Sequence, residues 1–348
     1  MKISAIIRTA IVACSLAGLC GAARSQVLSP VGVRTNAAAE WVPPLRAASD
    51  AGERAIARMR VPDDLKIGLW AAEPMLGNPN ALHLDEQGRV YVAETYRYHG
   101  GVIDIRGARS WLEEELASKT VEERLLIPRR HANERPGREA LYSPDSERIV
   151  LLEDTTGSGR ADKSTVFSTG YNGVKDGLGS GVFAYHGSVY YTCIPSLYLL
   201  QDANGDGKAD FKAELQYGYG VRYGFLGHDL HGMVLGPDGK LYFSVGDRGA
   251  NVTKTPDGRS VENAECGAVF RCDLDGRNLE LFATGLRNPQ ELRFDQYGNL
   301  FTGDNNPDKG DPARWVYVIE DGDSGWRVGY QHATRMANGR PWMAEQLW

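Results

Sequence analysis

Three short polar segments hold the residue types that could do chemistry: residues 227–232, 246–249 and 285–290. The first contains two histidines, the second an aspartate beside an arginine, and the third an Arg-Asn-Pro-Gln run. Histidine takes up a proton near neutral pH, a carboxylate can orient it, and arginine and asparagine can bind an anion. A fourth segment, residues 303–308, adds two aspartates and two asparagines. Together the segments predict a base with its orienting carboxylate beside an anion site.

A calcium loop is predicted at residues 202–210. Oxygen-bearing side chains occupy loop positions 1, 3, 5 and 9, and Gly207 at position 6 allows the sharp turn that a hard cation requires. Position 12 is Ala213, so the glutamate that ends an EF-hand loop is missing. The loop looks like the shorter calcium loops found between propeller strands. The alternative is a polar Asx-turn hairpin without metal. The predicted ligands are Asp202, Asn204, Asp206 and Asp210.

A related loop at residues 154–162 lies 48 positions earlier, since 202 − 154 = 48. It keeps the first and last aspartates but has Thr156 and Ser158 where the later loop has Asn204 and Asp206. With less negative charge, this loop is expected to bind little or no metal.

The elements around these loops are short strands joined by glycine turns. An apolar pair, a turn with glycine and an alternating apolar strand recur around Gly88, Gly239 and Gly298, which is typical of β-hairpins. Repeats of 40–50 residues made of short strands indicate propeller blades; a sandwich would not give this period. The sequence therefore predicts an all-β propeller. Its loops converge on one face, where the polar segments could form a single pocket.

The region before and between the strands differs in character. Residues 106–140 are charged and predict a surface insertion with a helix, which either rims a site or is a tolerated loop. We place the propeller domain at residues 64–348, after an extended or partly helical leader at 26–63.

The N-terminus predicts export. Lys2 and Arg8 precede an apolar run over residues 10–19, and small residues lead to Ser25. Residues 1–25 are therefore expected to be a signal peptide that directs the protein to the periplasm or the extracellular space, and the apolar run within them is too short to span a bilayer. The remaining cysteines, an odd number, are expected to be buried thiols: Cys193, Cys266 and Cys272.

Composition excludes several classes of protein. The chain has 348 residues, 39 Lys and Arg against 45 Asp and Glu, and a net charge of −6. A hydrophobic content of 42% and a charged content of 24% exclude a disordered chain and a polytopic membrane protein. An acidic pI near 5.7 without a basic run argues against nucleic-acid binding.

The polar segments, in order and spacing, resemble the glucose/sorbosone dehydrogenase group. The resemblance covers about 200 residues and implies an exported six-bladed β-propeller that uses pyrroloquinoline quinone (PQQ) with calcium. The repeated loops, Ala72-Glu73-Pro74 and Ala93-Glu94-Thr95 resemble one branch, the membrane-bound dehydrogenases of planctomycetes and verrucomicrobia. In that branch the N-terminal propeller is often followed by helical repeats and a cytochrome c domain.

The resemblance also implies roles for individual residues. His228 or His231, with His228 favoured, takes a proton from the substrate hydroxyl while hydride passes to the quinone, and Asp247 orients that histidine. The cofactor-binding residues implied are Arg248, Arg287, Asn288 and Gln290. The cofactor's calcium is implied to bind backbone carbonyls at Asn306 and Pro307.

Two hypotheses about function follow. The first is an exported oxidoreductase that oxidises a sugar or another alcohol or aldehyde group and passes electrons to a cytochrome. The second is a non-catalytic, calcium-stabilised propeller that binds carbohydrate or protein, because the residues that clamp PQQ later in the known enzymes have no match. The chain also ends without an evident closing strand, which predicts an incomplete propeller. Four aromatic residues are candidates for stacking on a sugar or for packing between blades: Tyr96, Tyr98, Tyr219 and Trp326.

Overall fold

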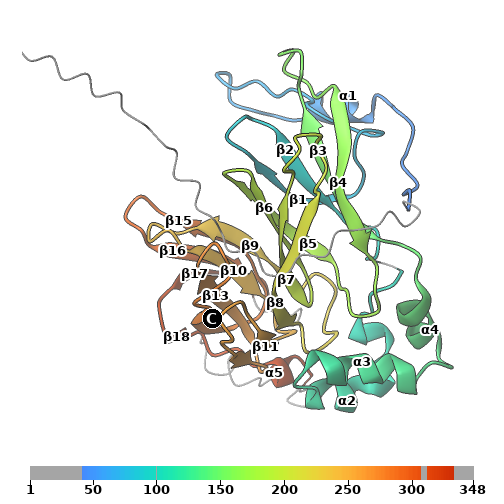
Figure 1. Cartoon of the computed structure of the whole chain (residues 1–348), viewed down its shortest axis with the longest axis vertical. Helices are drawn as coiled ribbons and strands as arrows, with labels where there is room; N and C mark the ends of the chain where they lie inside the picture. Colours follow the sequence, from blue (N-terminus) through green and yellow to red (C-terminus); the bar gives the residue numbers. More distant parts are fainter. Residues whose placement is uncertain (1–40, 99, 307–311, 333–348) are drawn as a thin grey trace, which may run out of the picture.

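The computed structural model describes residues 41–98, 100–306 and 312–332, and its strands form four sheets in succession along the chain (Figure 1). These sheets confirm the predicted all-β, propeller-like arrangement. The described residues make four blades, so the predicted count of six is not confirmed. The predicted signal peptide lies outside the described residues.

The first two blades lie in the N-terminal half of the chain. The first is an antiparallel sheet of β1 (Pro79–Leu84), β2 (Val90–Glu94), β3 (Glu147–Glu153) and β4 (Lys163–Tyr171). The second contains β5 (Gly179–Tyr185), β6 (Ser188–Cys193), β7 (Ser196–Gln201) and β8 (Phe211–Tyr219). Two later strands extend the second sheet beyond β8: β11 (Ala250–Lys254) and β12 (Val261–Asn263).

The other two blades follow. The third contains β9 (Leu230–Leu235), β10 (Leu241–Val245), β13 (Gly267–Cys272) and β14 (Glu280–Leu286). The short strand β18 (Gly322–Asp323) adds to β14 in parallel. The fourth contains β15 (Pro289–Phe294), β16 (Leu300–Asp304) and β17 (Arg314–Val318).

The three predicted glycine hairpins are confirmed. They connect β1 to β2, β9 to β10 and β15 to β16. The turn glycines Gly88, Gly239 and Gly298 have φ of 76°, 78° and 84°, a region that suits a residue without a side chain. In each turn the glycine N–H donates to the carbonyl oxygen three residues earlier. The same local sequence therefore closes the first hairpin in three of the four blades.

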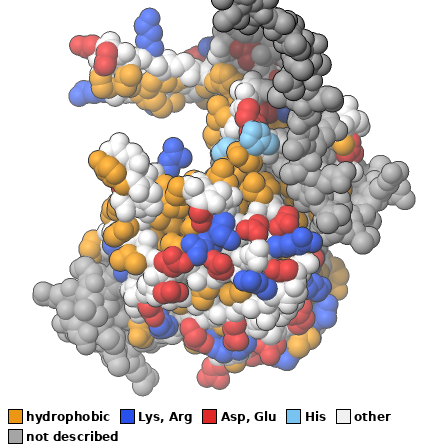
Figure 2. All heavy atoms as spheres, turned by 60° about the vertical axis from the view of Figure 1, so that its left-hand side comes forward, with side chains coloured by type: hydrophobic (Ala, Val, Ile, Leu, Met, Phe, Trp, Pro, Cys, Tyr) orange, Lys and Arg blue, Asp and Glu red, His pale blue; other side chains and the backbone are white. Residues whose placement is uncertain are grey.

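The first strands of the blades form the centre of the molecule. Strands β1, β5, β9 and β15 lie side by side in that order and line a cavity of about 430 Å³. Figure 2 shows apolar side chains around the hollow between the upper and lower parts of the molecule. Because β9 begins where β10 ends, the segments just outside these strands meet at one edge of the blades. Three of the predicted polar segments lie at this edge.

Apolar clusters between neighbouring blades make up the core. Tyr91, Tyr190 and Tyr242 occupy equivalent positions in the second strands of three blades, and each is at most 4% exposed. Each belongs to a cluster that combines side chains of adjacent blades. Burial of large aromatic rings between sheets stabilises this arrangement.

The predicted helical insertion is present and packs closely on the blades. It contains 3-10 turns at Ile105–Gly107 and Arg109–Trp111 and helices α2 (Leu112–Ala117), α3 (Val121–Arg130) and α4 (Arg135–Tyr142), seen together in Figure 1. Thr120 and Glu123 form a capping box at the start of α3. Trp111 and Ile127 are buried with Tyr223 and Phe225, which belong to the loop before β9. The insertion therefore supports the loop that leads to His228.

The remaining predictions about the described chain concern thiols and membranes. The three predicted thiols are buried and free, which confirms the expectation.

Two short helices flank the blades, α1 (Ala51–Ile56) and α5 (Val328–His332). Among the helices of the described residues, none has the length and apolar character needed to cross a bilayer.

Candidate functional site

A buried histidine–carboxylate pair lies at the edge where the polar segments meet. His228 Nδ1 is 2.7 Å from Asp247 Oδ1, and both residues are 4% exposed. The indole Nε1–H of Trp326 donates to the other oxygen of Asp247 at 3.0 Å. Trp326 itself is fully buried. The structure thus joins three distant segments through one carboxylate.

Tight turns hold the pair in place. The backbone N–H of His228 donates to the carbonyl oxygen of Phe225 at 3.2 Å, and the N–H of Asp247 donates to the carbonyl oxygen of Arg287 at 2.7 Å. A Cβ at Gly246 would lie 2.8 Å from the Cβ of His228 and 2.9 Å from Oδ1 of Asn288. Glycine at position 246 therefore permits the close approach of the three segments.

The surroundings of Asp247 favour its ionised form. Burial alone would raise the pKa of Asp247, but His228, Arg287 and the hydrogen bond from Trp326 outweigh it and lower the pKa below its ordinary value. The carboxylate is thus a charged acceptor that orients the imidazole ring.

His231 has different surroundings although it is only three residues away. Its Nδ1 is 2.9 Å from the backbone carbonyl oxygen of Gln290, and no carboxylate of the described chain is hydrogen-bonded to it. Burial lowers the pKa of the His231 imidazole. The two histidines that the sequence left as alternatives therefore differ at Nδ1: His228 contacts a carboxylate there, whereas His231 contacts a backbone carbonyl oxygen.

Arg287 and Asn288 lie beside the pair, held by a second buried carboxylate. Asp304 accepts hydrogen bonds from the backbone N–H of Arg287 at 3.1 Å and of Asn288 at 2.7 Å, and from Arg314 Nη2 at 2.8 Å. The Arg287 guanidinium donates to Asn305 at 2.7 Å. Asn288 Oδ1 is buried and has no hydrogen-bond partner within the described part of the chain. An unpaired buried acceptor of this kind is costly unless a ligand or water satisfies it.

Arg248 and Gln290 take positions that the sequence did not indicate. Arg248 is fully buried and forms an ion pair with Asp229, while its Nε and Nη2 have no hydrogen-bond partner among the residues that the structure describes. Gln290 is exposed, and its Nε2 donates to the carbonyl oxygen of Gly227 at 3.3 Å. Arg248 therefore lies beneath the site surface, whereas Gln290 borders it.

The predicted calcium ligands occur in two places. In the loop at 202–210, the carboxylate of Asp202 accepts from the N–H groups of Gly205 at 2.7 Å and Gly207 at 2.8 Å, and Asp210 accepts from Ala203. Among the described residues, no group of three or more His, Cys, Asp or Glu side chains is arranged to hold a metal ion. Calcium binding by this loop stays a prediction.

The cofactor calcium ligands can be followed only in part. Asn306 is described and half-buried, whereas Pro307 lies outside the described residues. The predicted pair of carbonyl ligands therefore also stays a prediction.

Two of the four aromatic residues considered for sugar stacking cannot take that role. Tyr219 and Trp326 are both fully buried. Tyr219 packs edge-on against Phe243 and Phe270, as expected for packing between blades. Trp326 instead binds Asp247, a contact across 79 residues that sequence patterns do not reveal. Sequence patterns likewise do not reveal that Asp229 pairs with Arg248 or that Asp304 pairs with Arg314.

Comparisons with known proteins agree with the resemblance. The chain is 27% identical over 124 residues to quinoprotein glucose dehydrogenase B of Acinetobacter calcoaceticus, covering 28% of this chain and 26% of that protein. The match confirms the resemblance to the glucose/sorbosone dehydrogenase group. It spans about a quarter of that relative's length.

Two solved structures are similar at a lower level. One is the holo form of the pyranose dehydrogenase PQQ domain of Coprinopsis cinerea, with a TM-score of 0.40, 12% identity, and coverage of 71% of this chain and 51% of that one. The other is the PQQ-bound aldose sugar dehydrogenase of Streptomyces coelicolor, with a TM-score of 0.39, 15% identity, and coverage of 72% and 63%. At such TM-scores these similarities support no assignment by themselves.

A family model described as a domain of unknown function matches most of the chain, residues 51–339. The match includes all four blades, the helical insertion and the segments around His228, Asp247 and Arg287. The chain therefore belongs to the DUF7133 family.

Proposed function

We propose that this protein is an oxidoreductase that oxidises a hydroxyl or aldehyde group of a sugar or another alcohol. The observation that supports the proposal is the buried contact of His228 with Asp247, which Trp326 completes. The carboxylate accepts a hydrogen bond from Nδ1–H and fixes the tautomer, so Nε2 is left as the proton acceptor. Within the described chain, His228 Nε2 has no hydrogen-bond partner, whereas Nδ1 is bonded to Asp247. His228, not His231, is thus the proposed base.

The residues next to the pair fit an anionic, oxygen-rich cofactor such as PQQ. Arg287 supplies a guanidinium beside the pair, and among the described residues the Nε and Nη2 groups of the buried Arg248 have no hydrogen-bond partner. Guanidinium groups bind carboxylates strongly. When bound, PQQ would supply the hydride acceptor. Arg287 and Asn288 would hold it, with Gln290 at the border and Arg248 below.

The proposal extends to the setting of the reaction. The N-terminal sequence supports export, and we propose that electrons pass on to a cytochrome c and that calcium assists binding of the quinone. The proposals about export, the cytochrome and calcium are each independent of the proposed role of His228.

Titration of PQQ onto the purified chain, with and without calcium and followed by calorimetry, tests the proposal. We expect saturable binding that requires calcium. Arg287→Ala should weaken binding at least about tenfold because a charge-assisted contact to the cofactor is lost. Arg277→Ala, which alters a half-exposed arginine, is the matched control and should bind normally.

Two results would count against this assignment. Unchanged affinity of Arg287→Ala, with a folded spectrum, would contradict the role of Arg287. Absence of binding in the unaltered protein would favour the non-catalytic propeller.

A further inference from the structure

A second buried ion pair accompanies the contact between His228 and Asp247. Asp229 and Arg248 are the residues that follow these two in the chain, and the Arg248 guanidinium donates to the Asp229 carboxylate. Both side chains are fully buried. The two contacts therefore join the same two turns, and in each the partners are 19 residues apart.

Asp229 also closes the turn around His228. Its Oδ2 accepts a hydrogen bond from the N–H of Gly227 at 3.2 Å, and its backbone carbonyl oxygen accepts one from the N–H of Gly246 at 3.1 Å. His228 thus lies between two residues that one carboxylate connects. The backbone on both sides of the imidazole is thereby fixed relative to the turn that contains Asp247.

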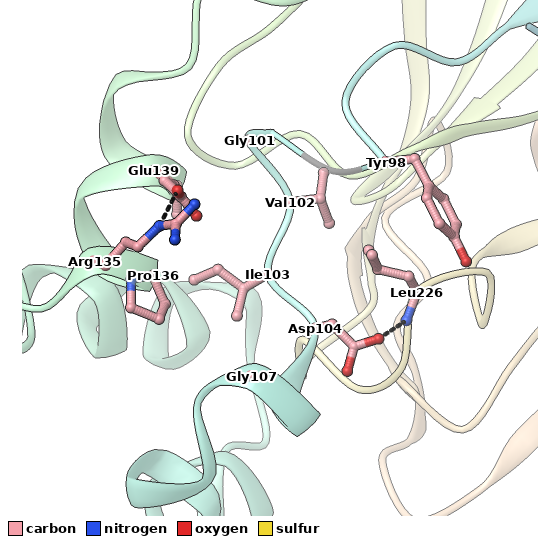
Figure 3. A pocket seen from close by; sticks show the side chains of 11 residues that line it. Tyr98, Gly101, Val102, Ile103, Asp104, Gly107, Arg135, Pro136, Glu139 and Leu226 are labelled. Atoms are coloured by element: carbon pink, nitrogen blue, oxygen red, sulfur yellow. Dashed lines mark hydrogen bonds and ion pairs between the residues drawn. The ribbon is translucent and has the colours of Figure 1, made fainter.

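Two other carboxylates hold the part of the loop that precedes His228. Asp104 Oδ2 accepts from the N–H of Leu226 at 3.2 Å, as Figure 3 shows, and Glu115 accepts from two further N–H groups of the loop at 3.2 and 2.5 Å. Both carboxylates belong to the helical insertion, so they tie the loop to the insertion. Of the three carboxylates, Asp229 is the one that ties the loop to the turn of Asp247.

The buried position of Arg248 makes it dependent on Asp229. A Cβ at Gly224 would lie 2.8 Å from Cγ of Arg248, so the arginine side chain packs closely against the loop. Within the described part of the chain, Asp229 is the sole ion-pair partner of Arg248. A buried cation that loses its partner is strongly destabilised unless the structure around it shifts. Such a shift would act on the turn beside His228.

We propose that Asp229 is a positioning residue that holds the His228 imidazole on Asp247. The inference rests on the proposed function, because it takes His228 as the base. Misplacement of a reacting group by about 1 Å can cost about 10²-fold in rate. The Asp229 carboxylate therefore contributes to the reaction through the position of His228, without contact to the substrate.

Proton NMR of the full chain without PQQ tests the position of the ring directly. A proton on Nδ1 that is shared with a buried carboxylate in a charge-assisted hydrogen bond resonates downfield of the backbone amides. We expect this resonance in the unaltered protein, assigned by its absence in His228→Gln. Asp229→Asn should remove the resonance or move it upfield, and it should slow sugar-dependent reduction of PQQ at least about tenfold.

The matched control is Glu94→Gln, which breaks a buried ion pair of the same kind in the first blade, between Glu94 and Arg148. It should leave the resonance in place and change the rate less than about twofold. A double variant, Asp229→Asn with Arg248→Gln, leaves no unpaired guanidinium and gives a second route if Asp229→Asn does not fold. It should show the same change in the resonance.

An unchanged resonance in a folded Asp229→Asn or in the double variant would overturn the inference. Absence of the resonance from the unaltered protein, or an equal change in Glu94→Gln, would do the same. Because the NMR measurement needs no cofactor, it separates this inference from the proposed function. A resonance that depends on Asp229 in a protein that never binds PQQ would support the role of Asp229 and contradict the proposed oxidoreductase.

Discussion

Asp247 and Asp202 both belong to glycine-rich turns after β-strands, but their carboxylates have opposite kinds of partner. Asp247 is buried and binds the side chains of His228 and Trp326, which are 19 and 79 residues away. Asp202 binds backbone N–H groups three to five residues further along its own loop, among them Gly205 and Gly207. The first arrangement orients a base; the second closes a hairpin.

The two hairpin loops show how general the second arrangement is. Asp154 accepts from the N–H groups four and five residues ahead at 3.0 and 2.7 Å, and Asp202 does the same at 3.1 and 2.8 Å. The extra charge at Asp206 is therefore not needed for the fold of the loop. An aspartate beside glycine indicates a turn, whereas long-range contacts and burial indicate a site.

The largest expected effect is on activity at Asp247. Asp247→Asn removes the acceptor that fixes the His228 tautomer, and we expect the rate of PQQ-dependent sugar oxidation to fall by about 10²–10⁴-fold. The matched variant Asp202→Asn should change the rate less than about twofold. A dye-linked assay measures both. Similar rates for Asp247→Asn and the unaltered protein would remove the distinction between the two aspartates.

Substitutions of Asp247 and Asp202 should differ less in their effect on the free energy of unfolding than in their effect on the rate. Asp247→Ala leaves the Trp326 N–H and the buried His228 without their acceptor, and we expect it to lower the free energy of unfolding by about 3 kcal/mol. Asp202→Ala removes an exposed acceptor of backbone N–H groups, and we expect a loss of about 1 kcal/mol, as for helix caps. Urea unfolding provides the comparison. A larger loss at Asp202 would contradict the account.

The repeated turns could be predicted from the sequence, whereas the partners within the site could not. Gly88, Gly239 and Gly298 occur in a local pattern that requires positive φ, and each is where expected. The contact of Trp326 with Asp247 and the burial of Arg248 depend on how blades pack, and local pattern has no information about that. The four-blade arrangement likewise depends on sheet packing.

Acid should weaken the contribution of Asp247. The folded-state pKa of Asp247 is lowered, so its contribution is complete above the unfolded value of about 3.9 and is lost as the pH falls through the folded value. The difference in free energy of unfolding between the unaltered protein and Asp247→Asn should stay constant from about pH 5 to about pH 4 and shrink below it. A difference that grows on acidification would contradict the assignment.

Calcium should have the smallest effect and tests the predicted loop. If the loop at 202–210 binds calcium, millimolar calcium should raise the melting temperature by about 2–4 °C, equivalent to about 1 kcal/mol. Asp206→Ala should abolish the shift, and Ser158→Ala in the related loop should leave it unchanged. A shift that survives in Asp206→Ala would place the ion elsewhere, and no shift would leave the loop as a metal-free turn.

The most direct test of the central claim is sugar-dependent reduction of PQQ, followed by absorbance, in the unaltered protein and in His228→Gln, after both are shown to bind the cofactor. If His228 is the base, reduction should be observed in the unaltered protein and should slow by at least about 100-fold in His228→Gln. Equal reduction rates in the two proteins, or no reduction in the unaltered protein with cofactor bound, would contradict the account.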